Sequence, residues 1–412
     1  MEAQTIEARK QRGQMIAQTC RITRSPKGDF LVPSQSGRGR YVVRYEDRSP
    51  FCNCPDFEQR GVLGIKCKHI WAVEITVNKH LNREGVPVAT KTLRVTYQQD
   101  WNAYNNAQVN EKELFMKMVY DLCQEIPNSV QTFGRPKLPM SDMIFASALK
   151  VYTTFSLRRF ESDMRAAMED GYVNSTPCFA SVGHFIQRSD LTPILIEMIT
   201  KTALPLASVE TDFAVDSSGF TTKRYARWHD FKYGRGKDVR VWLKAHLMCG
   251  IKTNIVTAAE ITEGYSNDTQ YLPQLVNATK LNFDIREVSA DKAYSSKNNV
   301  ETIVEAGGTP YIPFKKNMVA RARTPRLWKK LFHYFQLQRE DFLQHYHKRS
   351  NVETTFHMIK SKFGTQIRSK SKNAEINEVL LKILCHNISV VIQEMYERGI
   401  EANFCVRSGG DV

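Results

Sequence analysis

The sequence has no run of about 18 apolar residues, which is roughly the length that a membrane-spanning helix needs. Its start, MEAQTIEARKQRGQMIAQTC, is too polar for a secretory signal, so we expect a cytoplasmic protein. It also lacks a Gly-rich phosphate loop or nucleotide fingerprint, which argues against a nucleotide cofactor. These absences exclude a membrane partner and favour a globular protein.

Acidic residues are in short supply. The 43 Asp and Glu residues face 58 Lys and Arg residues, which gives a net charge of +15. Such an excess indicates a polyanionic partner, most simply nucleic acid, although a basic enzyme remains the alternative. The distribution favours nucleic acid, because seven basic residues and no acid lie between Lys315 and Lys330. Seven more lie between Phe342 and Lys372, with Glu353 as the only acid.

Cysteine is present in an odd number, nine, spread over 412 residues. Without an export signal, we expect reduced thiols or metal ligands, not disulfides. Cys123, Cys178, Cys249 and Cys385 are expected to be buried thiols.

The chain divides by composition into five segments. We expect a basic, flexible N-terminus, a Cys- and His-rich unit, a polar linker, a helical region and a mixed α/β region, at 1–40, 41–80, 81–110, 111–205 and 206–400. In the last segment, VETDFAVD, VRVWLKAHLM, NIVTAAEI, DIREVSA and TPYIPF are expected strands. A helix at SSKNNVETIVEAGG separates the last two, which predicts a parallel βαβ unit. Two long helices, around 346–363 and 376–397, follow.

Four soft metal ligands lie close together between Phe51 and Trp71. The sequence FCNCPDFEQRGVLGIKCKHIW holds Cys52-x-Cys54, twelve residues, and Cys67-x-His69. Three thiolates and one imidazole suit a closed tetrahedral site, so we expect one structural zinc ion. With Pro55-Asp56-Phe57 and the Cys-Lys-His-Ile joint, residues 40–80 resemble the SWIM zinc finger. That resemblance implies binding to DNA or to protein.

Three carboxylates are candidates for a second metal site. Asp216 and Asp291 are expected where two strands end, at the edge where open α/β sheets place their chemistry. Glu353, in YHKRSNVETTFHMIKSKFG, is the third. Hard oxygen ligands suit Mg²⁺ or Mn²⁺, and converging carboxylates can hold two such ions. Simpler interpretations stay open: a turn residue for Asp216, a loop residue or cap for Asp291, and an Arg349 partner for Glu353.

Spacing separates the three candidate carboxylates from two other acids, Asp212 and Asp268. Asp212 shares a strand face with Asp216 but lies further back, and Asp268 is expected to be a helix N-cap. On a helical wheel, a core stripe is predicted for Val352, Phe356, Ile359 and Phe363. Arg349, Glu353 and Lys360 fall together beside that stripe, with Tyr346 close to the same side. An acid flanked by bases is what phosphoryl transfer on DNA requires.

Residues from about 110 to 400 resemble a DDE transposase of prokaryotic insertion sequences. The matching residues are Asp216 in AVDSSGF, Asp291 in ADKAY, and the signature Tyr346-x2-Arg349-x3-Glu353-x6-Lys360. The resemblance implies an RNase H-like catalytic domain in which Asp216, Asp291 and Glu353 hold two Mg²⁺ or Mn²⁺ ions. It implies that Tyr346, Arg349 and Lys360 position DNA phosphates. The helical region at 111–205 is then expected to bind DNA.

Two departures from the family pattern are visible. Only 62 residues separate Asp291 from Glu353, so a β-rich insertion, present in some relatives, has no room. A SWIM-like finger is not a usual part of these enzymes. The expected function is cleavage of DNA at terminal inverted repeats and strand transfer into target DNA, by a homodimer that pairs two ends at the nucleoid. The alternatives are a transposon-derived nuclease without strand transfer and a DNA-binding regulator without activity.

Overall fold

The computed structural model describes residues 2–20, 22–25, 28–35, 39–46, 49–61, 64–77, 80–81, 87–89, 100–127, 137–222, 242–315, 325–402 and 404. The chain forms two compact units, residues 1–101 and 102–412. Within the described ranges, no helix is long and apolar enough to cross a membrane.

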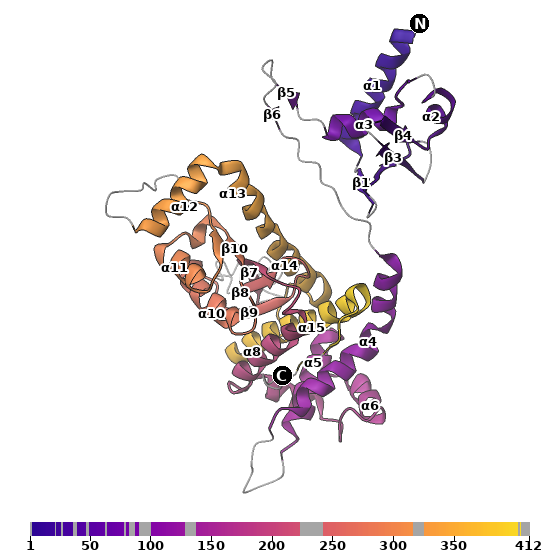
Figure 1. Ribbon diagram of the computed structural model, residues 1–412. Coiled ribbons are helices and arrows are strands. Elements are labelled where there is room, and N and C mark those ends of the chain that lie inside the picture. The colour runs from indigo at the N-terminus through magenta and orange to yellow at the C-terminus, as the bar shows by residue number, and fades with distance from the viewer. Residues whose placement is uncertain are drawn as a thin grey trace, which may run out of the picture. The chain divides into compact units, whose positions relative to one another are not determined.

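The N-terminal unit is a small antiparallel sheet with helices packed beside it (Figure 1). Its sheet runs in the order β1 (Thr23–Arg24), β2 (Phe30–Pro33), β3 (Arg40–Glu46) and β4 (Ser49–Cys52). The helices are α1 (Glu2–Thr19), α2 (Pro55–Arg60) and α3 (Lys68–Val77), and β5 (His80–Leu81) pairs with β6 (Pro87–Ala89). Strand β3 leads through β4 to the Cys- and His-rich segment.

The expectation of a flexible segment at 1–40 differs from the structure, which has α1 and two strands there. Helix α1 lies against α3, and Ile16 on it is fully buried. Gly13 permits this close approach, because a Cβ atom there would lie 2.6 Å from Trp71 Cβ and 2.9 Å from the Lys68 carbonyl oxygen. The polar composition hid the helix, since its stability comes from packing on α3 and not from intrinsic propensity.

The C-terminal unit begins with helices. They are α4 (Trp101–Gln124), α5 (Met140–Tyr152), α6 (Glu161–Glu169), α7 (Phe179–Ile186) and α8 (Leu191–Ala203). Helix α4 starts ten residues before the expected helical region at 111, inside the expected linker, of which 82–86 and 90–99 lie outside the described residues. Buried Ala103, Ala107 and Glu111 follow one another at helical spacing, a stripe that the surrounding Asn and Gln residues obscured.

A five-stranded mixed sheet forms the centre of this unit, in the order β11-β10-β7-β8-β9. Its strands are β7 (Asp212–Thr221), β8 (Trp242–Gly250), β9 (Val256–Glu263), β10 (Glu287–Ala290) and β11 (Thr309–Tyr311). Strands β7, β8 and β9 are antiparallel neighbours, whereas β10 and β11 run parallel to β7. The predicted mixed α/β class and the βαβ unit, β10–α11–β11, are therefore confirmed.

Further helices flank the sheet (Figure 1). They are α10 (Leu272–Lys280), α11 (Lys297–Glu305), α12 (Arg326–Leu337), α13 (Arg339–Tyr346), α14 (Ser350–Phe363) and α15 (Lys372–Arg398), with short 3-10 turns at η2 (Leu204–Leu206), η3 (Asp268–Tyr271), η4 (Lys292–Tyr294) and η5 (His347–Arg349). Helix α15 packs against α8, α5 and β9. A single hydrophobic core thus joins the segments 111–205 and 206–400, which the sequence had presented as separate domains.

Asn387 fastens α15 to the edge strand β9. Its side-chain oxygen accepts the Val256 N–H at 2.9 Å, and its amide donates to the carbonyl oxygens of Val256 and Ile199 at 2.7 and 3.2 Å. Asn387 is fully buried, so none of these groups can turn to water instead.

We expect Asn387→Ala to lower the free energy of unfolding by about 3 kcal/mol, because it leaves buried backbone groups unpaired and opens a cavity. Urea unfolding of the full chain measures the loss. Asn298→Ala, at an exposed position on α11, is the matched control and should cost less than about 0.5 kcal/mol. Equal effects of the two variants would contradict this role of Asn387.

Candidate functional site

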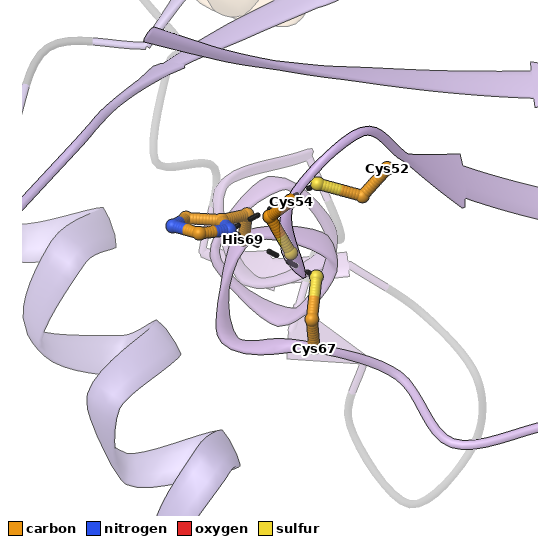
Figure 2. Close-up of side chains that lie close together, drawn as sticks. All are labelled: Cys52, Cys54, Cys67 and His69. Carbon is orange, nitrogen blue, oxygen red and sulfur yellow. Dashed lines mark hydrogen bonds between the residues drawn. The ribbon is translucent and has the colours of Figure 1, made fainter. Parts of the chain in front are cut away.

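The four predicted zinc ligands meet in the N-terminal unit. Cys52 ends β4, Cys54 precedes α2, Cys67 precedes α3, and His69 lies in the first turn of α3. Their ligand atoms all lie within 4.8 Å of one another, and Figure 2 shows the three sulfurs and the imidazole pointing toward one another. All four side chains are buried.

The spacing and the chemistry of this cluster fit zinc. His69 Nδ1 lies 3.9 Å from Cys52 Sγ and 4.0 Å from Cys67 Sγ. Ligands about 2.0–2.3 Å from a tetrahedral zinc ion would be spaced only slightly closer. Hydrogen bonds from Cys52 and then from Cys67 hold the pKa of Cys54 well below its usual range, while the hydrogen bond to Cys54 raises the pKa of Cys52, so without a metal ion the cluster holds one thiolate. The cluster therefore supports a zinc ion.

Cys67→Ser should lose the zinc that the wild-type chain carries, because a hydroxyl is a far weaker zinc ligand than a thiolate. Metal analysis of the purified full chain should give one zinc ion per wild-type chain and close to none for the variant. Cys178→Ser, at an exposed cysteine outside the cluster, is the control and should keep its zinc. Unchanged zinc in Cys67→Ser would refute the site.

Strand register places Asp216 beside Asp291. The parallel pairing of β7 with β10 ends at Val215 opposite Ala290, so the next residue on each strand is one of the two aspartates. Neighbouring strands lie about 4.8 Å apart, which makes the two residues neighbours at the carboxyl end of β10. The expectation that the β7 strand ends at Asp216 is wrong, because β7 continues to Thr221 by pairing with β8.

Glu353 approaches from α14. The predicted core stripe is confirmed, since Val352, Phe356, Ile359 and Phe363 are all buried. The single helix expected over 346–363 is instead divided into the end of α13, the turn η5 and α14. Arg349 lies in η5 and Tyr346 ends α13, so the signature residues come from three successive helical pieces.

Arg349 joins two of the three carboxylates. One of its terminal nitrogens donates to Asp216 Oδ2 at 2.7 Å, and the other donates to Glu353 Oε1 at 2.5 Å. Burial raises the pKa of Asp216, while the Ser217 N–H and Arg349 oppose that rise. Asp291 and Glu353 raise the pKa of Asp216 further by repulsion, so the three acids act on one another electrostatically.

Lys360 and Tyr346 flank this group. The Lys360 ammonium donates to Ser218 Oγ at 2.6 Å, two residues beyond Asp216 on β7, and lies over the Phe220 and Phe356 rings. Burial lowers the pKa of Lys360. Burial also raises the pKa of Tyr346, whose phenol is within electrostatic reach of Arg349 and Asp291. Arg349, Glu353 and Tyr346 therefore act on Asp216 itself, and Lys360 lies two residues further along the same strand.

The simpler interpretations are partly realised as well. Asp291 caps η4, because its side chain accepts the Lys292 N–H at 2.7 Å, and Glu353 does pair with Arg349. Asp216 is not a turn residue, since β7 runs on past it. Capping and pairing orient these carboxylates but leave further oxygen lone pairs for a ligand.

The competing acids are neutralised elsewhere. Asp212 accepts from Lys348 at 2.8 Å, and the same ammonium donates to Glu287 at 2.7 Å. Asp268 accepts from Lys244 at 2.8 Å. The N-cap expected at Asp268 is Asn267, so that expectation was wrong by one residue. These ion pairs leave the group around Asp216 as the acidic cluster at the end of β10.

Tyr294 is the residue near this site that sequence reasoning left without a role. It stands in the quoted ADKAY segment and is fully buried, and burial together with Asp268, Asp216 and Asp291 raises its pKa. Its position three residues after a candidate metal ligand was the available signal. Lys348 was also unassigned, although its ion pairs hold the start of α14 to β7 and β10.

The remaining predictions concern the basic run, the other cysteines and the segment between Asp291 and Glu353. Of the basic run at 315–330, residues 316–324 lie outside the described residues. Cys123, Cys249 and Cys385 are buried as expected, but Cys178 is exposed, because it stands at the start of α7, where the chain enters from an irregular segment. Between Asp291 and Glu353, the described residues contain helices and only the short strand β11, so no β-rich insertion appears among them.

Comparison with known proteins agrees with this architecture. Residues 207–388 match the family model of the transposase DDE domain, and residues 41–78 match that of the SWIM zinc finger. No curated protein and no solved structure matches the chain. Residues 207–388 of the C-terminal unit are thus similar to the transposase DDE domain, and residues 41–78 of the N-terminal unit are similar to the SWIM zinc finger.

The Arg349 bridge predicts a measurable coupling. Arg349→Met should lower the free energy of unfolding by about 1 kcal/mol, since it leaves two carboxylates in repulsion around a partly exposed site. Combined with Glu353→Gln, the loss should be smaller than the sum of the single losses. Chemical unfolding of the wild-type chain, the two single variants and the double variant gives a double-mutant cycle. Losses of unfolding free energy that add exactly would rule out the bridge in solution.

Proposed function

We propose that this protein is a transposase that cleaves DNA at terminal inverted repeats and joins the freed 3′ ends to target DNA. The single observation that carries the proposal is the convergence of Glu353 and Arg349 on Asp216, next to Asp291 in the sheet register. Residues 133 positions apart in sequence form this contact. Its location in the segment that matches the transposase DDE domain supports the assignment.

We propose further that the sheet is RNase H-like. Three antiparallel strands followed by two strands parallel to the first support this, as does the location of Asp216 on the central strand β7 and of Asp291 directly after its neighbour β10. Asp291 lies at the carboxyl end of the parallel strand β10, where the connection to the next helix begins. Open α/β sheets bind their ligands at such connections.

Asp216, Asp291 and Glu353 are proposed to hold two Mg²⁺ or Mn²⁺ ions. The donor set fits, because all three are carboxylates and hard cations prefer oxygen ligands. In the structure Arg349 occupies the space between Asp216 and Glu353, so its guanidinium has to turn away for both acids to share an ion. Bound ions of this kind activate a water or 3′-hydroxyl and stabilise the oxygen that leaves phosphorus.

The neighbouring side chains would act on the DNA itself. Once released from Asp216, the Arg349 guanidinium can donate two parallel hydrogen bonds to one phosphate. Arg349 would therefore bind a DNA phosphate next to the scissile bond. Lys360, already desolvated between two aromatic rings, adds a cation that loses little further hydration on meeting a phosphate. Tyr346 supplies a phenol that can donate to a phosphate oxygen.

The remaining parts are proposed to bind DNA and a second copy. The zinc module, the expected finger over 41–80, would contact the element ends, and the helices of 111–205 would add to that surface. Pairing of two ends implies a homodimer on DNA. The net charge of +15 supports a DNA partner throughout.

Glu353→Gln should abolish cleavage while DNA binding stays within about twofold, because one metal ligand is lost but the positive surface remains. The assay uses the full chain, Mg²⁺, a DNA fragment that carries the element's ends from the flanking genomic sequence, and a target plasmid. Electrophoresis separates cut and joined products.

The outcomes separate the candidate functions. Cut ends joined to plasmid by the wild-type chain alone would support the transposase and the role of Glu353 together. Cutting without joining would favour the nuclease, and cutting by Glu353→Gln at the wild-type rate would refute the carboxylate site. Binding without cutting by either protein would favour the regulator.

A further inference from the structure

A basic pocket lies away from the three carboxylates, where the loop after α14 meets α5 and α7. Its volume is about 540 Å³. The lining includes Lys150 on α5, Phe155 and Leu157 in the following segment, and Arg368, Lys370 and Ser371 before α15. Three basic residues line the pocket, and no acidic residue is among its lining residues.

Lys150 is the unusual member of this pocket. It is only 8% exposed, and its ammonium makes no hydrogen bond and no ion pair with any residue that the structure describes. A buried ammonium is costly because it loses hydration, and it makes no close ion pair here that would offset the loss. Burial accordingly lowers the pKa of Lys150, although Glu378 attracts it from a distance.

One carboxylate, Glu378, attracts Lys150 but is shared with other groups. Glu378 accepts the backbone N–H groups of Arg368 and Ser369 at 3.0 and 2.8 Å, and Lys382 lies 3.7 Å from it. Glu378 therefore stabilises the loop that forms one wall of the pocket. Because this one carboxylate faces Lys150 and Lys382 together, positive charge remains in excess at the pocket.

The N-terminus of α15 opens on the same pocket. Ser371 and Ala374 line it, and α15 is 27 residues long, so its first-turn N–H groups carry the positive end of a long helix dipole. Ser371 stands at the N-cap position, but its side chain does not cap these groups. Unbonded N–H groups at a helix start favour a phosphate oxygen.

We propose that this pocket binds a backbone phosphate of the DNA substrate, with Lys150 and the start of α15 as its ligands. The inference rests on the proposed function. Hydrogen bonds to the catalytic strand support DNA as the source of the phosphate, since the Thr221 N–H donates to the Thr365 carbonyl and the Ile367 N–H donates to the Thr221 carbonyl. Apolar Phe155 and Leu157 provide room for a sugar beside the phosphate.

The pocket and Asp216 are connected through β7. Thr221, five residues after Asp216 on that strand, is hydrogen-bonded to the segment that leads into Arg368 in the pocket wall. A phosphate in the pocket would therefore add a second contact to a duplex that also lies at Asp216.

Lys150→Met tests the site with a side chain of similar length and no charge. Binding of the full chain to a labelled duplex that carries the element's ends, without Mg²⁺, is followed by fluorescence anisotropy at several salt concentrations. One lost phosphate contact should reduce the salt slope by about one, which weakens binding about eightfold at 0.1 M salt. The melting temperature should stay level or rise, because an unpartnered buried charge is removed.

Two further proteins make the result decisive. Lys280→Met removes a lysine on α10 whose ammonium donates to the Glu305 carbonyl oxygen at 2.6 Å, outside the pocket and outside residues 111–205, and should leave the salt slope unchanged. Lys370→Met, at the exposed rim of the pocket, should weaken binding as Lys150→Met does, even if the buried substitution disturbs folding. Wild-type slopes in both pocket variants would overturn the proposal.

Other outcomes distinguish the source of the phosphate and the proposed function. If inorganic phosphate raises the melting temperature of the wild-type chain but not of Lys150→Met, while both bind DNA equally, the pocket serves a free anion and the DNA assignment is wrong. If the wild-type chain binds no DNA, both the proposed function and this site fail. If Lys150→Met binds normally and Glu353→Gln still loses cleavage, only the pocket proposal fails.

Discussion

The bridge from Arg349 to Asp216 and Glu353 is the interaction on which the proposed catalytic centre depends. One guanidinium joins a central strand to the start of α14, and it balances two carboxylates that would otherwise repel. Lys348, one residue earlier, repeats the arrangement with Asp212 and Glu287. Two adjacent cations thus set α14 against β7 and β10 before any DNA or metal arrives.

The packing behind this bridge keeps it in place. The buried face of α14 fixes the direction of Glu353, and α15 covers the sheet through a large apolar contact and the Asn387 hydrogen bonds. Helix α15 also carries buried charges. Glu378 accepts backbone N–H groups of the loop before α15 and lies close to Lys382. Charge pairs inside a packed core lock a loop into one geometry, and that geometry also shapes the pocket at Lys150.

Much of this could be predicted from the sequence, where local patterns carry the information. The Cys-x-Cys and Cys-x-His pairs predicted the zinc cluster, and the apolar spacing of Val352 and Phe356 predicted which face of α14 is buried. The βαβ unit followed from a capped helix between two apolar runs. Each of these features depends on residues that are near one another in sequence.

What depended on tertiary contacts could not be predicted. Helix α1 is polar and gains its stability from α3 through Gly13, so its composition suggested a flexible segment. The strand at Asp216 continues because β8 pairs with it, which no local turn signal reveals. Likewise, nothing in the sequence near Lys150 indicates that it lines a basic pocket, since the wall of the pocket comes from residues more than 200 positions away.

The central claim is that Asp216, Asp291 and Glu353 bind divalent metal once Arg349 turns aside. Electron paramagnetic resonance titration of the full chain with Mn²⁺ tests it most directly, since free and bound Mn²⁺ give different signals. The account predicts saturable binding by the wild-type chain and its loss in both Asp216→Asn and Asp291→Asn, with Asp212→Asn unaffected. Equal Mn²⁺ binding by the wild-type chain and the two aspartate variants would contradict it.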